Sequence, residues 1–352
     1  AISTALIIGL AIAGMGCFMF FPAAEIKIYG FFLFSLFVLA SGITILQIAA
    51  NPYVAILGSP ETASSRLTMT QAFNSLGTFL APYFGQILIL SPHIDTERMD
   101  EFTPYELEMF LSNEAKSVQM PYVGLALTLL FLAFMIFVAK LPKFKTNNTM
   151  SSNEKFSFSL VARKYPHLIF GAIAIFMYVG GEVAIGSYIV NLLGESNIKG
   201  MLEKDAAGYL PYYWGGAMVG RFAGAYLLTR FKPSHILAFC TTMVCLLLLL
   251  TINTNGDVAM YSVISIGLFN SIMFPVIFTL SIDGLGDHTS KASSILVMMI
   301  VGGAVMPYAH GMLADIKSIG IQKAFIIPLI CYAYLVFFAL KGYKRKAVLE
   351  IL

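Results

Sequence analysis

The stretch HLIFGAIAIFMYVGGEVAIGSYIVNLL, residues 167–193, decides the fold class of this chain. It is apolar over more than the roughly 20 residues of helix that cross the hydrocarbon core of a bilayer. Its one carboxylate is Glu182. A carboxylate at this depth is costly in lipid, so it should face a bundle interior or a water-filled cavity. We therefore predict a membrane-spanning helix with a functional acid, and the alternative is a neutral, hydrogen-bonded structural carboxyl.

The whole chain has the composition of a polytopic membrane protein. Of its 352 residues, 58% are hydrophobic and 12% are charged, whereas a soluble domain carries about 25% charged residues. The net charge of +3 gives no indication of nucleic-acid binding. The four cysteines lie in apolar stretches and form no CxxC pair, which favours packing over disulfides or metal binding.

Ten apolar segments are long enough to cross a bilayer. The connection over residues 91–118 is acidic, and the one over residues 141–166 is basic and rich in Ser and Asn. We interpret the second as a linker between a four-span bundle, residues 1–140, and a six-span bundle, residues 167–352. The predicted spans are 2–22, 28–57, 68–90, 119–140, 167–193, 206–229, 234–253, 257–281, 290–315 and 322–341.

The placement of Lys and Arg predicts the orientation of these spans. Most of these residues fall on one side, which includes the linker and the tail after residue 340. By the positive-inside rule, that side is the cytoplasm. A linker followed by six spans is typical of two-bundle transporters with six spans in each half. We therefore expect that two further spans precede residue 1.

Polar side chains at helical spacing mark the candidate binding residues. Gln47 and Asn51 are four residues apart and Gln71 and Asn74 are three apart, so each pair shares a helix face. Such amides offer donors and acceptors to sugar hydroxyls, and helix–helix hydrogen bonding is the alternative. Asn270 is the strongly polar side chain at mid-depth in its span.

Other features favour packing or give no site. Trp214 could stack on a sugar ring, although packing is the commoner role of a lone tryptophan. His310 is predicted to be a hydrogen-bonded interface residue rather than a ligand. The GLGD string at 284–287 matches intramembrane aspartyl proteases, but no second aspartate in a span is placed to pair with Asp287. No HExxH, GxSxG or P-loop motif is present, so we do not expect an enzyme.

Five motifs in order resemble the fucose–galactose–glucose:cation symporter family of the major facilitator superfamily. The resemblance covers nearly the whole chain and implies the all-helical two-bundle fold. It also implies uptake of a hexose or 6-deoxyhexose with co-transported H⁺ or Na⁺, by alternating access, across the cell inner membrane and without another cofactor. The motifs are LQIAANPYV (46–54), RLTMTQAFNSLG (66–77), YVGGEVAIGSY (178–188), GLFNSIMFP (267–275) and GGAVMP (302–307).

The resemblance also implies roles for single residues. The fucose–proton branch has an acid at the position of Gln47 and a glutamine at that of Glu182, so this chain looks more like the glucose/galactose branch. Gln71 and Asn74 match cavity-lining positions of the family. The segment from Arg221 to Arg230 resembles the cytoplasmic loop motif that latches helices during rocking, and a plain positive-inside cluster is the alternative.

Taken together, the sequence predicts a membrane-embedded sugar–cation symporter that works as a monomer. Gln47, Asn51, Gln71, Asn74 and Asn270 would bind sugar hydroxyls. Glu182 would couple the cation or hold a sugar hydroxyl. A sugar sensor that does not transport is the alternative, and an intramembrane enzyme is a weaker one.

Overall fold

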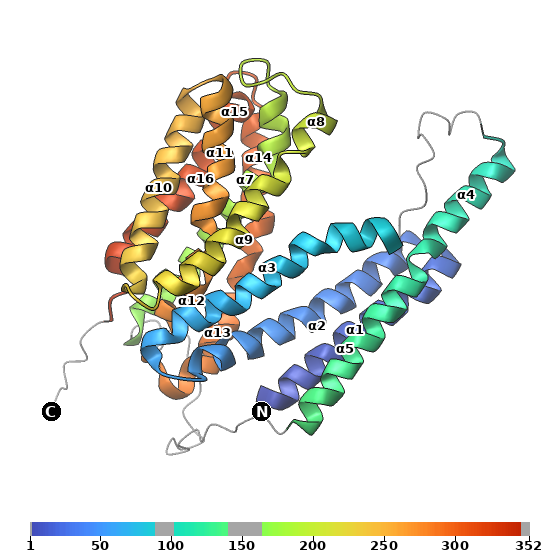
Figure 1. The fold of residues 1–352 in the computed structure, drawn as a ribbon, viewed down its shortest axis with the longest axis horizontal. Coiled ribbons are helices and arrows are strands. Elements are labelled where there is room, and N and C mark those ends of the chain that lie inside the picture. Colours follow the sequence, from blue (N-terminus) through green and yellow to red (C-terminus); the bar gives the residue numbers. More distant parts are fainter. Residues whose placement is uncertain (1, 89–101, 140–163, 346–352) are drawn as a thin grey trace. The chain divides into compact units, whose positions relative to one another are not determined.

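The computed structural model describes residues 2–88, 102–139 and 164–345, and every regular element in these ranges is helical (Figure 1). The contacts divide the chain into two compact units. The first comprises residues 1–53 and 80–145, and the second comprises residues 54–79 and 146–352. The predicted all-helical class is confirmed. The predicted linker lies largely outside the described residues, and the domain boundaries drawn from it stay a prediction.

The first unit is built around α1 (Ile2–Ile26) and α5 (Gln119–Val138), which pack along each other. The rings of Phe20 and Tyr122 lie 4.1 Å apart at this contact. The unit also contains most of α2 (Tyr29–Ile56). It includes α4 (Pro104–Ser117), which begins at a capping box formed by Thr103 and Glu106.

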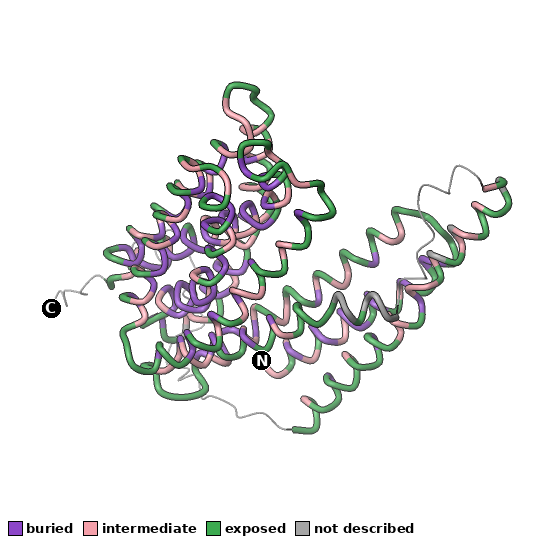
Figure 2. Tube along the Cα trace, turned by 45° about the horizontal axis from the view of Figure 1, so that its top comes forward, coloured by how far each residue is buried: buried purple, intermediate pink, exposed green. Residues whose placement is uncertain are grey.

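The second unit is centred on α7 (Pro166–Gly194), which packs against α12 (Met273–Ile282), α14 (Gly302–Ala314) and α16 (Ile326–Phe337). In Figure 2 the buried residues gather in the helices of this unit. Its other elements are η1 (Pro60–Thr62), the first part of α3 (Ala63–Leu88), α8 (Glu203–Ala207), α9 (Leu210–Leu227), α10 (Pro233–Asn253), α11 (Gly256–Asn270), α12 (Met273–Ile282), η3 (Gly286–His288), α13 (Thr289–Met298), η4 (Met299–Val301), α14 (Gly302–Ala314), α15 (Gly320–Ala324), α16 (Ile326–Phe337) and η5 (Phe338–Gly342).

Glycines set how closely the helices of the second unit approach. A Cβ on Gly302 of α14 would overlap the backbone of Phe176 on α7. A Cβ on Gly267 of α11 would overlap the Tyr213 carbonyl on α9. Small residues at helix crossings allow such contact in membranes, where van der Waals packing replaces the hydrophobic effect between helices.

Arg66 at the start of α3 closes the end of α2. Its guanidinium donates to the carbonyls of Val54 and Ala55, at 3.3 and 2.7 Å, and to the carbonyl of Ser59 at 2.9 Å. The last carbonyls of a helix lack partners within the helix. Arg66, the first residue of the motif at 66–77, therefore fixes the turn between two helices.

Eight helices in the described residues are long and apolar enough to cross a membrane. The helices α3 and α9 lie in predicted spans but are not among the eight. Both carry polar side chains, including Gln71 and Asn74 on α3 and Arg221 on α9. The ten-span count, and the two spans expected before residue 1, therefore stay predictions. The eight are Ile2–Ile26, Tyr29–Ile56, Tyr105–Val138, Pro166–Gly194, Pro233–Asn253, Gly256–Ile282, Thr289–Ala314 and Gly320–Gly342.

Gln322 joins three connections at one end of the second unit. Its side-chain Nε2 donates to the carbonyls of Thr251 and Thr254 at the end of α10, at 2.9 and 2.6 Å. Its Oε1 accepts from Asn197 Nδ2 at 2.7 Å. We expect Gln322→Ala to lower the free energy of unfolding by about 1 kcal/mol, because these groups lose their partner. Thermal unfolding in detergent measures this.

The neighbouring Lys323 is exposed and provides the control. Lys323→Ala should unfold at the same temperature as the unmodified chain. Equal unfolding temperatures for Gln322→Ala and Lys323→Ala would show that the hydrogen bonds of Gln322 contribute no net stability.

Candidate functional site

Glu182 lies near the middle of α7, in a cluster of polar side chains from α7, α9, α11 and α16. Its side chain is 12% exposed. Tyr178, one helical turn earlier, donates its hydroxyl to Glu182 Oε1 at 2.7 Å, and the same hydroxyl lies 3.0 Å from the Asn270 carbonyl. The predicted burial of this acid inside a bundle is therefore what the structure shows.

Asn270, at the end of α11, connects the helices around Glu182. Its side chain is fully buried. Its Nδ2 donates to the Tyr213 hydroxyl at 2.8 Å, and its Oδ1 accepts from the Tyr332 hydroxyl at 2.7 Å. Tyr213 in turn donates to the Glu182 carbonyl at 3.1 Å. Both ends of the Asn270 amide are thus engaged by tyrosines in this conformation, and its predicted sugar contact stays a prediction.

Arg221 of α9 faces the same acid. Its Nη2 lies 4.0 Å from Glu182 Oε1, and its side chain is 15% exposed. Its Nε donates to the Ser271 carbonyl at 3.2 Å, and its Nη1 donates to Ser75 Oγ on α3. From the sequence, Arg221 was predicted to be a loop latch, and its pairing with Glu182 was not predicted. Its position inside a predicted span was the available signal, because a charged residue at membrane depth usually has a partner.

Pro275 explains why the cluster forms at this point. Proline has no N–H and its ring collides with the carbonyl four residues earlier, which here is Ser271. The predicted span 257–281 is accordingly broken between α11 and α12. The freed carbonyl of Ser271 accepts a hydrogen bond from Arg221 instead, and the Asn270 carbonyl lies 3.0 Å from the Tyr178 hydroxyl. Broken helices expose backbone groups in this way only where protein or a cavity satisfies them.

The amides predicted on the first half lie on two different helices. Gln71 is half-buried and Asn74 is exposed on α3, which also carries Ser75, the partner of Arg221. Gln47 is exposed on α2, and Asn51 is buried with no hydrogen-bond partner for its Nδ2 among the described residues. An unsatisfied buried amide donor is costly, so it marks a place where a ligand hydroxyl or water would be stabilised.

Three further residues from the sequence analysis have other surroundings. Arg230 is exposed after α9, with its guanidinium 5.8 Å from the centre of the Tyr226 ring. Trp214 is 37% exposed and packs edge-on against Tyr213. His310 is fully buried and stacked on Tyr188, and neither ring nitrogen has a partner among the described residues. The expectation of a hydrogen-bonded His310 is therefore wrong, since aromatic packing holds it.

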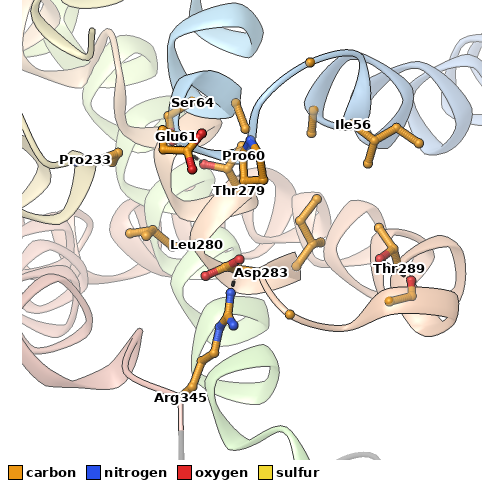
Figure 3. Close-up of a pocket in the computed structure, with 16 residues that line it drawn as sticks. Ile56, Pro60, Glu61, Ser64, Pro233, Thr279, Leu280, Asp283, Thr289 and Arg345 are labelled. Atoms are coloured by element: carbon orange, nitrogen blue, oxygen red, sulfur yellow. Dashed lines mark hydrogen bonds and ion pairs between the residues drawn. The ribbon is translucent and has the colours of Figure 1, made fainter. Parts of the chain in front are cut away.

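A separate pocket of about 640 Å³ lies between the α2–α3 turn and the segment that follows α12. Figure 3 shows Glu61, Ser64, Thr279 and Asp283 around it, with Arg345 paired to Asp283. Glu182 is not among the residues that line this pocket. Hydrogen bonds from the backbone of Glu61 and from the Ser59 side chain lower the pKa of the Glu61 carboxyl.

The cluster around Glu182 has defined chemical capacities. It combines a carboxylate, a guanidinium, an amide and three phenolic hydroxyls. Carboxylates hold protons or hard cations, and hydroxyls and amides suit sugar hydroxyls. The described residues contain no group of three His, Cys, Asp or Glu side chains that could hold a metal ion.

Comparison with known families and structures shows which proteins this chain is similar to. A family model described as Major Facilitator Superfamily matches residues 3–307. The chain belongs to the major facilitator superfamily. The glucose/galactose transporter of Brucella abortus is 49% identical over 339 residues, which cover 96% of this chain and 78% of that protein. The L-fucose-proton symporter of Escherichia coli K12 is 35% identical and covers 95% and 77%, respectively.

Among solved structures of this superfamily, the transporter FucP in its outward conformation aligns with a TM-score of 0.90. The two sequences are 34% identical, and the alignment covers 97% of this chain and 83% of FucP. These relatives confirm the resemblance to the fucose–galactose–glucose:cation symporter family and to its all-helical fold. They are named as transporters and symporters rather than as enzymes.

Proposed function

We propose that this protein is a secondary transporter that carries a hexose or 6-deoxyhexose across the membrane together with a monovalent cation. The observation that carries the proposal is the buried cluster around Glu182 in a chain that is 49% identical to a glucose/galactose transporter. An acid kept inside a membrane bundle is costly, and its usual role lies on a substrate or ion pathway. Substrates of the glucose/galactose type are favoured over fucose by the higher identity to that relative.

The roles of the site residues follow from this proposal. Glu182 couples the cation, H⁺ or Na⁺, to sugar movement. Gln47, Asn51, Gln71 and Asn74 bind sugar hydroxyls, and such a contact is supported by Asn51 Nδ2, which has no partner in the part of the chain that the structure describes. Asn270 serves the sugar site in a conformation that releases its amide from Tyr213 or Tyr332.

The arrangement in the membrane is part of the same proposal. Ten helices cross the bilayer, because α3 and α9 contribute polar faces to the transport path in addition to the eight more apolar spans. The chain works as a monomer in the inner membrane and has its C-terminus in the cytoplasm, supported by the basic residues after residue 340. Alternating access exposes the site to each side in turn.

Sugar counterflow tests the proposal. We expect purified protein in liposomes preloaded with unlabelled glucose to take up labelled glucose without an ion gradient, because exchange needs only the sugar pathway. Galactose, fucose and N-acetylglucosamine added outside rank the substrates by competition. Binding of labelled glucose without counterflow would point to a sensor, and neither binding nor counterflow by folded protein would contradict a hexose site.

A further inference from the structure

Arg221 has more contacts than a loop latch requires. Each nitrogen of its guanidinium approaches a partner from a different part of the chain: Glu182 on α7, the Ser271 carbonyl after α11, and Ser75 on α3. The side chain is 15% exposed, so most of its charge is removed from solvent. The buried guanidinium therefore connects three parts of the chain within the site and is not a solvated surface charge.

Arg221 lies close enough to Glu182 to compensate its charge, but the two side chains do not form a hydrogen-bonded salt bridge. Their closest atoms are 4.0 Å apart, beyond the 2.7–3.2 Å typical of N–H···O hydrogen bonds. The Glu182 oxygen concerned already accepts the Tyr178 hydroxyl at 2.7 Å. Arg221 thus compensates the negative charge that burial makes costly, while leaving the carboxylate open to a second positive species.

The same guanidinium also ties Glu182 to a helix from the other side of the linker. Ser75 lies on α3, which precedes the linker in sequence, whereas α9 follows it. Two further contacts accompany this one: Ser65 Oγ donates to the Ala225 carbonyl at 2.6 Å, and the rings of Phe73 and Phe222 lie 5.9 Å apart. A change in the charge of Glu182 therefore reaches the contact between α3 and α9 through one side chain.

We propose that Arg221 is the resident counter-cation of Glu182, and that the coupling ion competes with it for the carboxylate. Binding of the ion neutralises Glu182, removes the attraction that holds Arg221, and frees Arg221 from Ser75. This inference rests on the proposed sugar–cation symport and adds the step by which ion occupancy alters a helix–helix contact. Sodium and a proton share the chemistry required, since each is a small cation that a carboxylate binds.

The other groups around Glu182 do not provide this compensation. The titratable side chains that face it are Tyr178 on its own helix and Tyr213 on α9, and Tyr332 of α16 joins through Asn270. Phenols are neutral at ordinary pH. Arg221 is the positive group that the structure places against Glu182 in the described part of the chain.

The test measures the cation concentration that gives half-maximal sugar uptake in liposomes. One series varies sodium at fixed pH, and the other varies pH at fixed sodium, so the two arms identify the ion. Arg221→Gln removes the competitor, and we expect the half-maximal concentration of the active ion to fall by about tenfold, within the range of coupled sites. Lys204→Gln removes an exposed cation that precedes the same helix and should leave this concentration unchanged.

An unchanged half-maximal concentration in Arg221→Gln would overturn the inference and leave Arg221 as a packing residue. Arg221→Lys keeps the charge, so a value near that of the unmodified protein is expected. A shift in the lysine variant as large as in the glutamine variant would also contradict the inference. Ser75→Ala should shift the value in the same direction but less, and an unaffected Ser75→Ala would remove Ser75 from the proposed step.

Two measurements keep the result interpretable. Counterflow without an ion gradient is measured first, because its absence in the unmodified chain contradicts the proposed function rather than the role of Arg221. If Arg221→Gln alone does not fold, the double variant Glu182→Gln, Arg221→Gln removes both charges together. We expect the double variant to unfold at a higher temperature than either single variant. A double variant that unfolds at a lower temperature than both would contradict the pairing of Arg221 with Glu182.

Discussion

Glu182→Gln is expected to abolish sugar accumulation driven by an ion gradient while leaving sugar counterflow in place. Glutamine keeps the size of the side chain and can still accept the Tyr178 hydroxyl, so the sugar pathway stays intact. It cannot bind a proton or compensate a cation. The sugar concentration inside the liposomes should therefore only reach that outside. If the ion gradient concentrates the sugar about tenfold or more in the unmodified protein, accumulation falls by the same factor.

The measurement compares uptake of labelled glucose with and without an imposed ion gradient, in the same preparation used for counterflow. Glu203→Gln is the matched control, because Glu203 is an exposed acid in the same half of the chain. The loss of the negative charge leaves Arg221 buried without its counter-charge, so we also expect a decrease of about 1–3 kcal/mol in stability. Normal accumulation by Glu182→Gln would remove Glu182 from the coupling role.

Gly267→Ala is expected to have the largest effect on the structure of the site. The added Cβ would overlap the carbonyl of Tyr213, which is backbone and cannot move to another rotamer. Separation of α9 from α11 would displace the Tyr213 hydroxyl from Asn270 and from the Glu182 carbonyl. Overpacking of this kind costs about 1–3 kcal/mol or more, so both the unfolding temperature and counterflow should fall.

Gly215 offers a matched control on α9, because a Cβ there meets no atom within 4 Å. Gly215→Ala should leave counterflow unchanged and should stabilise the helix slightly, by up to about 1 kcal/mol, since glycine is the more flexible residue in the unfolded chain. Similar behaviour of the two alanine variants, in thermal unfolding and in counterflow, would show that the α9–α11 contact tolerates expansion.

The sequence predicted the helices better than their interactions. Each predicted span overlaps a helix in the described residues, because apolar length and helical periodicity are local properties. The spans 257–281, 290–315 and 322–341 each consist of more than one helical element. The sequence predicted a single span over 257–281, whereas the structure breaks it after Asn270. The consequence of this break, a Ser271 carbonyl that accepts from Arg221 and an Asn270 carbonyl close to the Tyr178 hydroxyl, depends on which helices stand opposite.

By itself, the sequence determined that this is an all-helical membrane protein, that Glu182 lies buried within it, and that its motifs resemble one transporter family. A carboxylate in an apolar membrane helix is stable only where it faces the bundle interior or a water-filled cavity. The burial of Glu182 could therefore be predicted from its position in the sequence. Only the tertiary structure decided that Arg221 faces Glu182 and that Asn270 is held between Tyr213 and Tyr332. Such contacts join helices far apart in the chain, and the faces that meet are set by packing at glycines such as Gly267 rather than by local pattern.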